Sequence, residues 1–355
     1  MASLSKHILG IGLVVVLLVS FAAACDDDSD KPPNEVSLRN WEGDISQAIL
    51  DGFKEETGIT VNYVPYDSQE QALADMQAGE VYDVVVLENQ LIPGAVAEGL
   101  LAELDYNNIP NFKNISPNFR DLAYDPQNAH AIPYSWGTTG LVFRSDLVVE
   151  PVTGWADMWN EAYAGKLMGW PLERYIIGLA LKMLGYSLNS EDPAELQAAL
   201  GKLLEIKPHL TLREWEPAVA APYLESGEIW LAIGQADDVI AAREAGVAVD
   251  YILPEEGGLL WGDNFTIQAN SPRKAAAEKL INYLLQAEVS AQIINETYYW
   301  LPNDAALEFV VPELRENTAI FPTQEMLKNA EILLPLTAAG EALYADIWAQ
   351  FLAEE

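Results

Sequence analysis

Aromatic side chains stand next to carboxylates, or at the ends of predicted strands, at several points in the 355-residue sequence. The groups are Trp41-Glu42, Trp261-Gly262-Asp263 and Tyr298-Tyr299-Trp300. The face of an aromatic ring attracts a cation, and a carboxylate supplies the opposite charge and hydrogen-bond acceptors. This combination could bind an organic ammonium group. The alternative for any single tryptophan is core packing, which we expect for Trp155 and Trp159.

Motifs of enzymatic chemistry are missing from the sequence. His130 and His209 follow the N-terminal leader, and neither has a partner at the spacing of metal ligands. The chain has no G-x-S-x-G nucleophile elbow and no G-x-x-x-x-G-K-[ST] phosphate loop. Acidic pairs such as Asp237-Asp238 and Glu255-Glu256 are expected by chance in so acidic a chain. We therefore expect a protein that is not an enzyme and that uses no cofactor or metal.

The charge of the chain is strongly negative. It carries 54 Asp and Glu against 19 Lys and Arg, a formal net charge of −35. Nucleic acids need basic residues opposite their phosphates, and anionic membrane surfaces attract basic segments, so we expect neither as a docking partner. A negative field attracts cationic ligands, although acidity also serves to keep a protein surface soluble.

The first 25 residues predict an export signal that ends at a lipidation site. Lys6 gives a positive start, residues 8–24 are uncharged and mostly apolar, and small residues precede Cys25. This apolar run is shorter than the ~20 residues that span a bilayer with comfort. The cysteine after the small residues resembles a bacterial lipobox, which implies cleavage before Cys25 and lipid on that residue. We expect a signal peptide at 1–24 and a lipidated, flexible tether at 25–35; a plain secreted protein or a retained anchor is the alternative.

Strand and helix patterns alternate through the rest of the chain. Ser68 and Gln71 have the spacing of a capping box, and the apolar run at 82–87 is typical of a parallel strand buried on both faces. The alternation predicts an α/β fold with a parallel sheet, and residues 126–140 are expected to form an irregular crossover. The expected strands are 36–40, 59–66, 82–87, 229–233 and 247–253, and the expected helices are 44–57, 68–79, 192–204, 236–245 and 271–286.

Several segments resemble the spermidine/putrescine-binding proteins, the extracellular receptors of polyamine ABC transporters. They occur in the same order as in that family: NWEGDISQAILDGFKEETGITVNYVPYDS (40–68), YDVVVLEN (82–89), AIPYSWGTTGLVF (131–143), GWADMW (154–159), LPEEGGLLWGDNFTIQAN (253–270), KLINYLL (279–285) and the Tyr299 region. The resemblance implies a two-lobed periplasmic-binding-protein-like fold of type II, with the ligand held in a cleft between the lobes. It implies one lobe of residues 36–137 plus 264–304 and a second of residues 138–263 plus 305–355.

The resemblance also implies a set of ligand-binding residues. Trp41, Trp261, Asp263 and Tyr299 match family positions, with Asp263 as the principal amine-binding carboxylate, and Glu42 is added as a neighbouring carboxylate. At other positions the chain differs from the family. Asp44 stands in place of a Tyr, Glu88 and Gln90 in place of a Ser and a Tyr, and Gln235 in place of a Trp; the family's acidic pair falls near Leu172 and Tyr175, where Glu173 is the carboxylate present.

These substitutions preserve the number of acidic groups in the expected cleft. Asp44 and Glu88 add two carboxylates, and two are lost near Leu172 and Tyr175. We therefore expect a dication to be neutralised with its second ammonium group moved within the cleft.

The expected partners are a small polyamine-like cation, the subunits of an ABC permease and, through the lipid anchor, the cell membrane. We expect a monomer outside the cytoplasm, anchored at the cell surface or in a periplasm. Other ligands of the same fold remain open: ferric iron, which the adjacent Tyr298 and Tyr299 would suit as hard oxygen ligands, a thiamine-like or other organic cation, or a sugar. An extracytoplasmic enzyme and a structural or adhesive surface protein are the alternatives from other classes.

Overall fold

The computed structural model describes residues 35–66 and 68–353. The predicted signal peptide, Cys25 and all but the last residue of the predicted tether lie outside these residues. A search of the described ranges finds no helix with the length and apolar character needed to cross a membrane.

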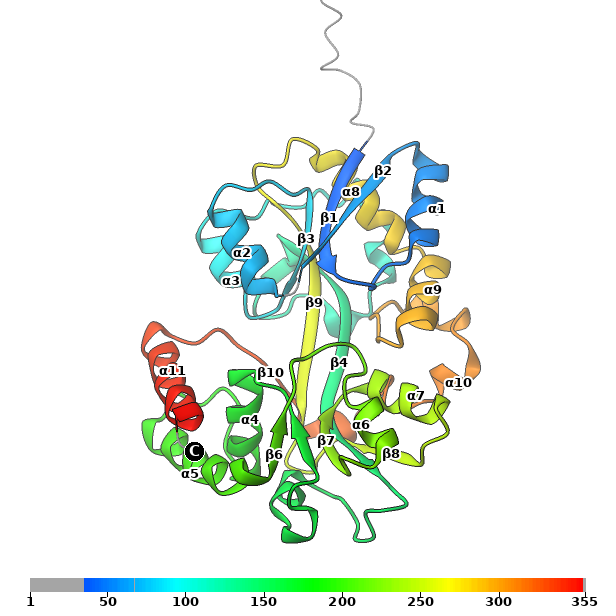
Figure 1. Ribbon diagram of the computed structural model, residues 1–355. Helices are drawn as coiled ribbons and strands as arrows, with labels where there is room; N and C mark the ends of the chain where they lie inside the picture. The colour runs from blue at the N-terminus through cyan, green and yellow to red at the C-terminus, as the bar shows by residue number, and fades with distance from the viewer. Residues whose placement is uncertain (1–34, 67, 354–355) are drawn as a thin grey trace, which may run out of the picture. The chain divides into compact units, whose positions relative to one another are not determined.

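Strands and helices of the described chain alternate from the N-terminal end onward (Figure 1). The strands are β1 (Glu35–Trp41), β2 (Thr60–Tyr66), β3 (Val84–Glu88), β4 (Ala131–Arg144), β5 (Leu167–Gly169), β6 (Leu210–Leu212), β7 (Leu231–Gly234), β8 (Val249–Ile252), β9 (Leu259–Ile267) and β10 (Glu331–Ile332). The α-helices are α1 (Gln47–Thr57), α2 (Gln69–Gln77), α3 (Ile92–Ala97), α4 (Glu173–Met183), α5 (Pro193–Ile206), α6 (Ala221–Ser226), α7 (Ala236–Glu244), α8 (Lys274–Leu284), α9 (Ala287–Thr297), α10 (Pro312–Arg315) and α11 (Ala338–Ala353). Short 3₁₀ helices include η5 (Trp155–Trp159) and η8 (Asp304–Glu308).

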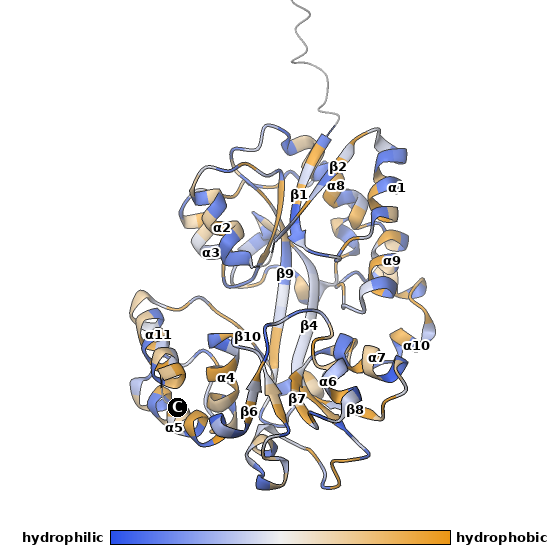
Figure 2. Ribbon diagram, in the orientation of Figure 1, coloured by the Kyte–Doolittle hydropathy of each residue, from blue (hydrophilic) through white to orange (hydrophobic). Residues whose placement is uncertain are grey.

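The sheet is mixed, so the prediction of a parallel sheet is correct for some strand pairs and wrong for others. Its strands follow the order β2-β1-β3-β9-β4-β7-β5-β6, with β10 beside β9 and β8 beside β4. β1 pairs in parallel with β2 and β3, whereas β9 runs antiparallel to both β3 and β4. The apolar run predicted correctly that β3 is buried, and Figure 2 colours the chain by this hydropathy. Burial on both faces does not fix the direction of the neighbouring strand.

Strand β4 replaces most of the irregular crossover that was predicted at 126–140. Pro133, Gly137 and Gly140 lie within it, and such residues usually argue against a central strand. The register with β9 shifts between Pro133 and Trp136, so a bulge absorbs the irregular stretch. Figure 1 shows β4 and β9 side by side along their length, crossing from one half of the sheet to the other.

Two large hydrophobic cores define two lobes. The first core includes residues of β1, β3, α1, α8 and α9, and the second includes residues of β5, β7, α4, α5 and α11. Trp155 is 2% exposed in the second core, and Trp159 packs against it, as expected. The exact residue boundaries of the lobes stay a prediction; Ala306 and Val310, assigned to the second lobe, pack in the first core.

Local capping signals predicted some helix starts and missed one. Ser68 Oγ accepts the backbone N–H of Gln71 at 3.1 Å, so the predicted start of α2 is confirmed. Helix α8 begins at Lys274, not at 271, because Ser271 Oγ accepts the N–H of Arg273 and donates to Asp83 Oδ1 at 2.6 Å. Ser271 therefore ties the preceding turn to the sheet and does not cap the helix.

Candidate functional site

A cleft of about 510 Å³ opens between the two lobes. It lies where several strands end, which is the usual position of ligands in open α/β sheets. Its walls come from side chains packed on both cores. The lining residues are Trp41, Asp44, Ser68, Gln69, Glu70, Glu88, Gln90, Leu172, Glu173, Arg174, Tyr175, Glu214, Trp215, Gln235, Trp261, Asp263, Tyr299 and Leu333.

The structure brings ten of the eleven predicted ligand-binding residues to this cleft. Glu42 is the one that it does not place there. Glu42 directly follows Trp41 at the end of β1 and is exposed. Glu42 lies in the turn that follows the strand, and its exposed side chain is not among the residues that line the cleft.

Asp263 and Glu88 face each other across adjacent strands. They are directly opposed in the antiparallel register of β9 and β3, and Asp263 is 5% exposed. Each carboxyl group is held by hydrogen bonds from amides: Gln90 Nε2 donates to Glu88 Oε2, and Gln69 Nε2 donates to Asp263 Oδ1 at 2.6 Å. The floor of the cleft thus carries two fixed carboxyl groups side by side.

Gln69 links these two strands at the floor. While its Nε2 donates to Asp263, its Oε1 accepts the backbone N–H of Glu88. Gln69 is the first residue of α2 and is 2% exposed, so the helix start predicted from Ser68 also positions this amide. Both ends of the amide are occupied, which orients the carboxyl group of Asp263 towards the cleft.

Two tryptophans lie on two glycines where β4 crosses β9. Trp136 is paired with Gly262, and Gly137 with Trp261. A methyl group added at Gly137 would lie 2.2 Å from Trp261 Cζ2, and one at Gly262 would lie 2.4 Å from Trp136 Cε2. The Trp136 ring fills the first core, whereas the Trp261 ring lines the cleft. The glycines are therefore required for both rings to lie flat on the sheet.

Aromatic rings form walls on both sides of the floor. Trp41, at the end of β1, meets Trp215 of the second lobe edge to face, with ring centroids 5.3 Å apart. Trp261 meets Tyr299 in the same way at 5.4 Å. Edge-to-face contacts of this kind stabilise the rings in fixed orientations and leave other ring faces free for an aliphatic chain or a cation.

The cleft is acidic. Six of its described lining residues carry carboxyl groups, and the one guanidinium among them belongs to Arg174. That guanidinium is engaged on the second lobe, where it donates to Leu334 O and Asn189 Oδ1 and lies 5.0 Å over the ring of Tyr344. Arg174 forms no ion pair with Glu88 or Asp263, although its charge lowers the pKa of Glu88 against the larger effect of burial.

Burial disfavours the charged forms of these carboxyl groups. Desolvation, followed by the charge of Asp263, raises the pKa of Glu88 to about 8. Desolvation raises the pKa of Asp263 to about 6 against the opposing effect of its hydrogen bonds from Gln69, Trp41 and Ser135. Burial likewise raises the pKa of Asp44 well above its usual value, with the charges of Asp263 and Asp237 adding to the effect. A cation in the cleft would reverse these shifts by pairing with the carboxylates.

Sequence reasoning missed several lining residues. Gln69 and Glu70 lie at the start of α2, and Glu214 and Trp215 lie in the loop after β6. The capping signal at Ser68 marked the helix start but not the side of the chain that would face the cleft. Trp215-Glu216 and Glu214-Trp215 carry the same aromatic–acid pattern that marked the other candidates, so this signal was available in the sequence.

The side chains of the adjacent Tyr298 and Tyr299 do not lie at the same site. Tyr299 lines the cleft, whereas the hydroxyl of Tyr298 lies 3.4 Å from Glu244 Oε1 and is not among the lining residues. Within residues 35–66 and 68–353, no three His, Cys, Asp or Glu residues are grouped so as to hold a metal ion. The paired-tyrosine arrangement that the iron alternative needs is therefore not formed at the cleft.

Comparison with known protein families identifies the family of this chain. The model of the bacterial extracellular solute-binding protein family matches residues 48–323. The chain belongs to this family. It is 34% identical over 330 residues to the spermidine/putrescine-binding periplasmic protein of Escherichia coli K12, with 92% of each chain covered. It is 29% identical over 358 residues to the putrescine/agmatine-binding protein of Pseudomonas aeruginosa, with 95% of this chain and 97% of the relative covered.

A solved member of the family has the same fold. The spermidine/putrescine ABC transporter substrate-binding protein PotD of Streptococcus pneumoniae superposes with a TM-score of 0.81 at 30% identity, covering 90% of this chain and 98% of that one. The predicted two-lobed α/β fold of periplasmic binding proteins is thereby confirmed, as is the predicted family.

Proposed function

We propose that this protein captures a polyamine outside the cytoplasm and delivers it to the permease of an ABC importer. The observation that carries the proposal is the opposed pair of buried carboxyl groups, Asp263 and Glu88, on a floor between tryptophan rings. A polyamine carries ammonium groups on an aliphatic chain, and it matches this surface in both respects. The names of the similar proteins, which bind spermidine, putrescine or agmatine, support the same ligand class.

Capture proceeds by closure of the cleft. Trp41 packs on the first core, and Asp263 lies on β9, which runs from one lobe to the other (Figure 1). Tyr175 and Trp215 pack on the second core. A ligand that touches both sets gains its full contacts only when the lobes are closed around it, so it favours the closed form. In the proposed mechanism, the permease then receives the ligand from the closed protein.

We also propose that the mature protein begins at a lipidated Cys25 and acts as a monomer held to the membrane by its tether. This part rests on the N-terminal sequence alone. It fits the proposed transport role, because a tether keeps the receptor near its permease.

Calorimetric titration of the purified chain 26–355 with putrescine, spermidine and spermine tests the ligand class. We expect saturable binding of at least one of them, together with a rise in melting temperature at excess ligand. Thiamine and a neutral sugar serve as controls of other classes. Absence of heat and of a thermal shift with all three polyamines would refute the proposed ligand.

Replacement of Gly137 by alanine tests the role of the tryptophan platform. The added methyl group would displace the ring of Trp261, so we expect polyamine affinity to fall by about tenfold or more. Gly201→Ala is the matched control, because a methyl group at that site in α5 meets no atom within 4 Å. Equal affinities of the two variants would show that the position of Trp261 is not needed for binding.

A further inference from the structure

Leu333 forms an apolar part of the cleft wall. It directly follows β10, lines the cleft and is 5% exposed. It shares a buried cluster with Leu188 and Leu259. The rings of Tyr175 and Trp261, which also line the cleft, pack against that cluster. Beside the Trp261 ring, the side chain of Leu333 therefore offers a ligand hydrocarbon and no hydrogen-bond partner.

Asn189 fixes the backbone on both sides of Leu333. Its Nδ2 donates to Ile332 O at 2.9 Å, and its Oδ1 accepts the backbone N–H of Leu334 at 2.8 Å. One amide side chain thus pairs with the two backbone groups that flank Leu333. Asn189 lies in the loop between α4 and α5 and is not among the lining residues, so it acts on the cleft only through the groups that it holds.

Helix α4 fastens the same segment at two further points. The guanidinium of Arg174 donates to Leu334 O at 3.2 Å. The ammonium of Lys182 donates to Glu331 Oε1 at 2.7 Å. Because α4 packs in the second core, these bonds attach the wall at Leu333 to the second lobe.

A wall of this kind distinguishes a methylene group from a charged nitrogen. A methylene group gains free energy when hydrocarbon replaces the water around it. An ammonium group at the same point loses its hydration and gains no acceptor from Leu333, which is costly. The distinction requires a fixed wall, because a mobile segment would let water reach the nitrogen.

We propose that Leu333 is a specificity-determining residue that selects an uncharged methylene segment beside Trp261, and that Asn189 is the positioning residue that holds it there. The inference rests on the proposed function and deepens it. The preferred amines carry an unbroken aliphatic stretch along this wall, and an internal ammonium group at this point is disfavoured.

Two ligands of equal length isolate the preference. Spermidine and octamethylenediamine have their terminal nitrogens separated by the same number of chain atoms, but spermidine has an ammonium group where the diamine has a methylene group. We expect calorimetry to show that the wild type binds the diamine at least as tightly as spermidine, although the diamine carries one charge fewer. Leu333→Gln supplies a hydrogen-bond partner and should shift the affinity ratio towards spermidine by about tenfold.

Asn189→Ala tests the positioning role. It releases the segment that carries Leu333, so the affinity ratio should shift in the same direction as in Leu333→Gln. Asn114→Ala is the matched control, because Asn114 Nδ2 also donates to a backbone carbonyl, that of Leu285 in the first core at 3.0 Å, and Asn114 does not line the cleft. This control should keep the wild-type ratio.

The ratio separates selectivity from folding, because a loss of stability lowers the binding of both ligands alike. A wild-type preference for spermidine of about tenfold or more, or an unchanged ratio in Leu333→Gln, would overturn the selection by Leu333. An unchanged ratio in Asn189→Ala would overturn the positioning role. If that variant does not fold, Asn189→Asp replaces it, because aspartate keeps the acceptor for Leu334 and loses the donor to Ile332. These outcomes leave the proposed function standing, whereas failure of the wild type to bind any polyamine would refute it.

Discussion

Replacement of Asp263 by asparagine is expected to weaken polyamine binding by about 100-fold or more. The substitution leaves a buried ammonium without its opposing charge, and breaking a buried ion pair costs about 3–5 kcal/mol. Asparagine can still accept the 2.6 Å hydrogen bond from Gln69 Nε2, so the floor of the cleft should keep its shape. Calorimetry with spermidine measures the loss.

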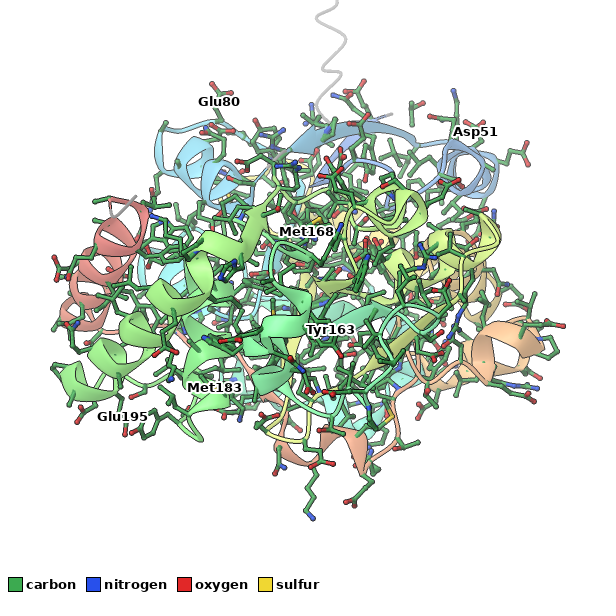
Figure 3. All side chains as sticks on the ribbon, turned by 60° about the horizontal axis from the view of Figure 1, so that its bottom comes forward. Asp51, Glu80, Tyr163, Met168, Met183 and Glu195 are labelled. Atoms are coloured by element: carbon green, nitrogen blue, oxygen red, sulfur yellow. The ribbon has the colours of Figure 1, made fainter. Side chains whose placement is uncertain are left out.

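Two controls make this result specific to the charge. Asp51→Asn removes a carboxylate from the exposed face of α1, where Figure 3 shows its side chain projecting outward, and should bind like the wild type. The ligand-free Asp263→Asn protein should melt no lower than the wild type, because it no longer buries an acid. If Asp263→Asn kept wild-type affinity, Asp263 would not be the ammonium anchor.

Polyamine affinity should rise steeply with pH between 5 and 8. Burial raises the pKa of Asp263 to about 6 and that of Glu88 to about 8, and each must lose its proton to pair with an ammonium group. Below the pKa of each group, the deprotonated fraction that can bind an ammonium falls about tenfold for each pH unit. The two groups together therefore predict a loss of affinity of about 1,000-fold or more from pH 8 to pH 5. Titrations in buffers of different ionisation enthalpy should also detect proton release on binding at pH 7.

The stability of the ligand-free protein should change in the opposite sense. The pKa values of Asp263 and Glu88 are higher in the folded chain than in the unfolded chain, so folding takes up protons. Their stabilising contribution is present below about pH 4 and is lost as the pH rises through 6 and 8. Glu88→Gln should flatten both profiles above pH 6. An affinity that stays constant from pH 5 to 8 would contradict the role of these two carboxyl groups.

The fold could be predicted where local signals are strong. Ser68 caps α2, and Asp192 followed by Pro193 begins α5, because these signals act within one helical turn. Strand β4 was missed because Pro133 and two glycines are local arguments against a strand. The long pairing with β9 outweighs them, and a partner 120 or more residues away leaves no mark in the local pattern.

The candidate site was predictable as a set of residues but not as a geometry. Trp261 and Asp263 could be selected because they lie close together in an unusual aromatic–acid pattern. The opposition of Glu88 and Asp263 depends on an antiparallel register, and the link through Gln69 depends on where α2 meets the sheet. Much of the charge of −35 is surface acidity, as at Asp51 and Glu80 (Figure 3), and the total therefore gave little indication of the cleft.

A crystal structure of the chain 26–355 grown with spermidine tests the binding mode most directly. We predict a closed cleft with one nitrogen of the ligand within hydrogen-bond distance of Asp263 and with its aliphatic chain against Trp41 and Trp261. Spermidine bound outside the cleft, or within it but without a nitrogen at Asp263, would contradict polyamine capture by the buried carboxylates of this site.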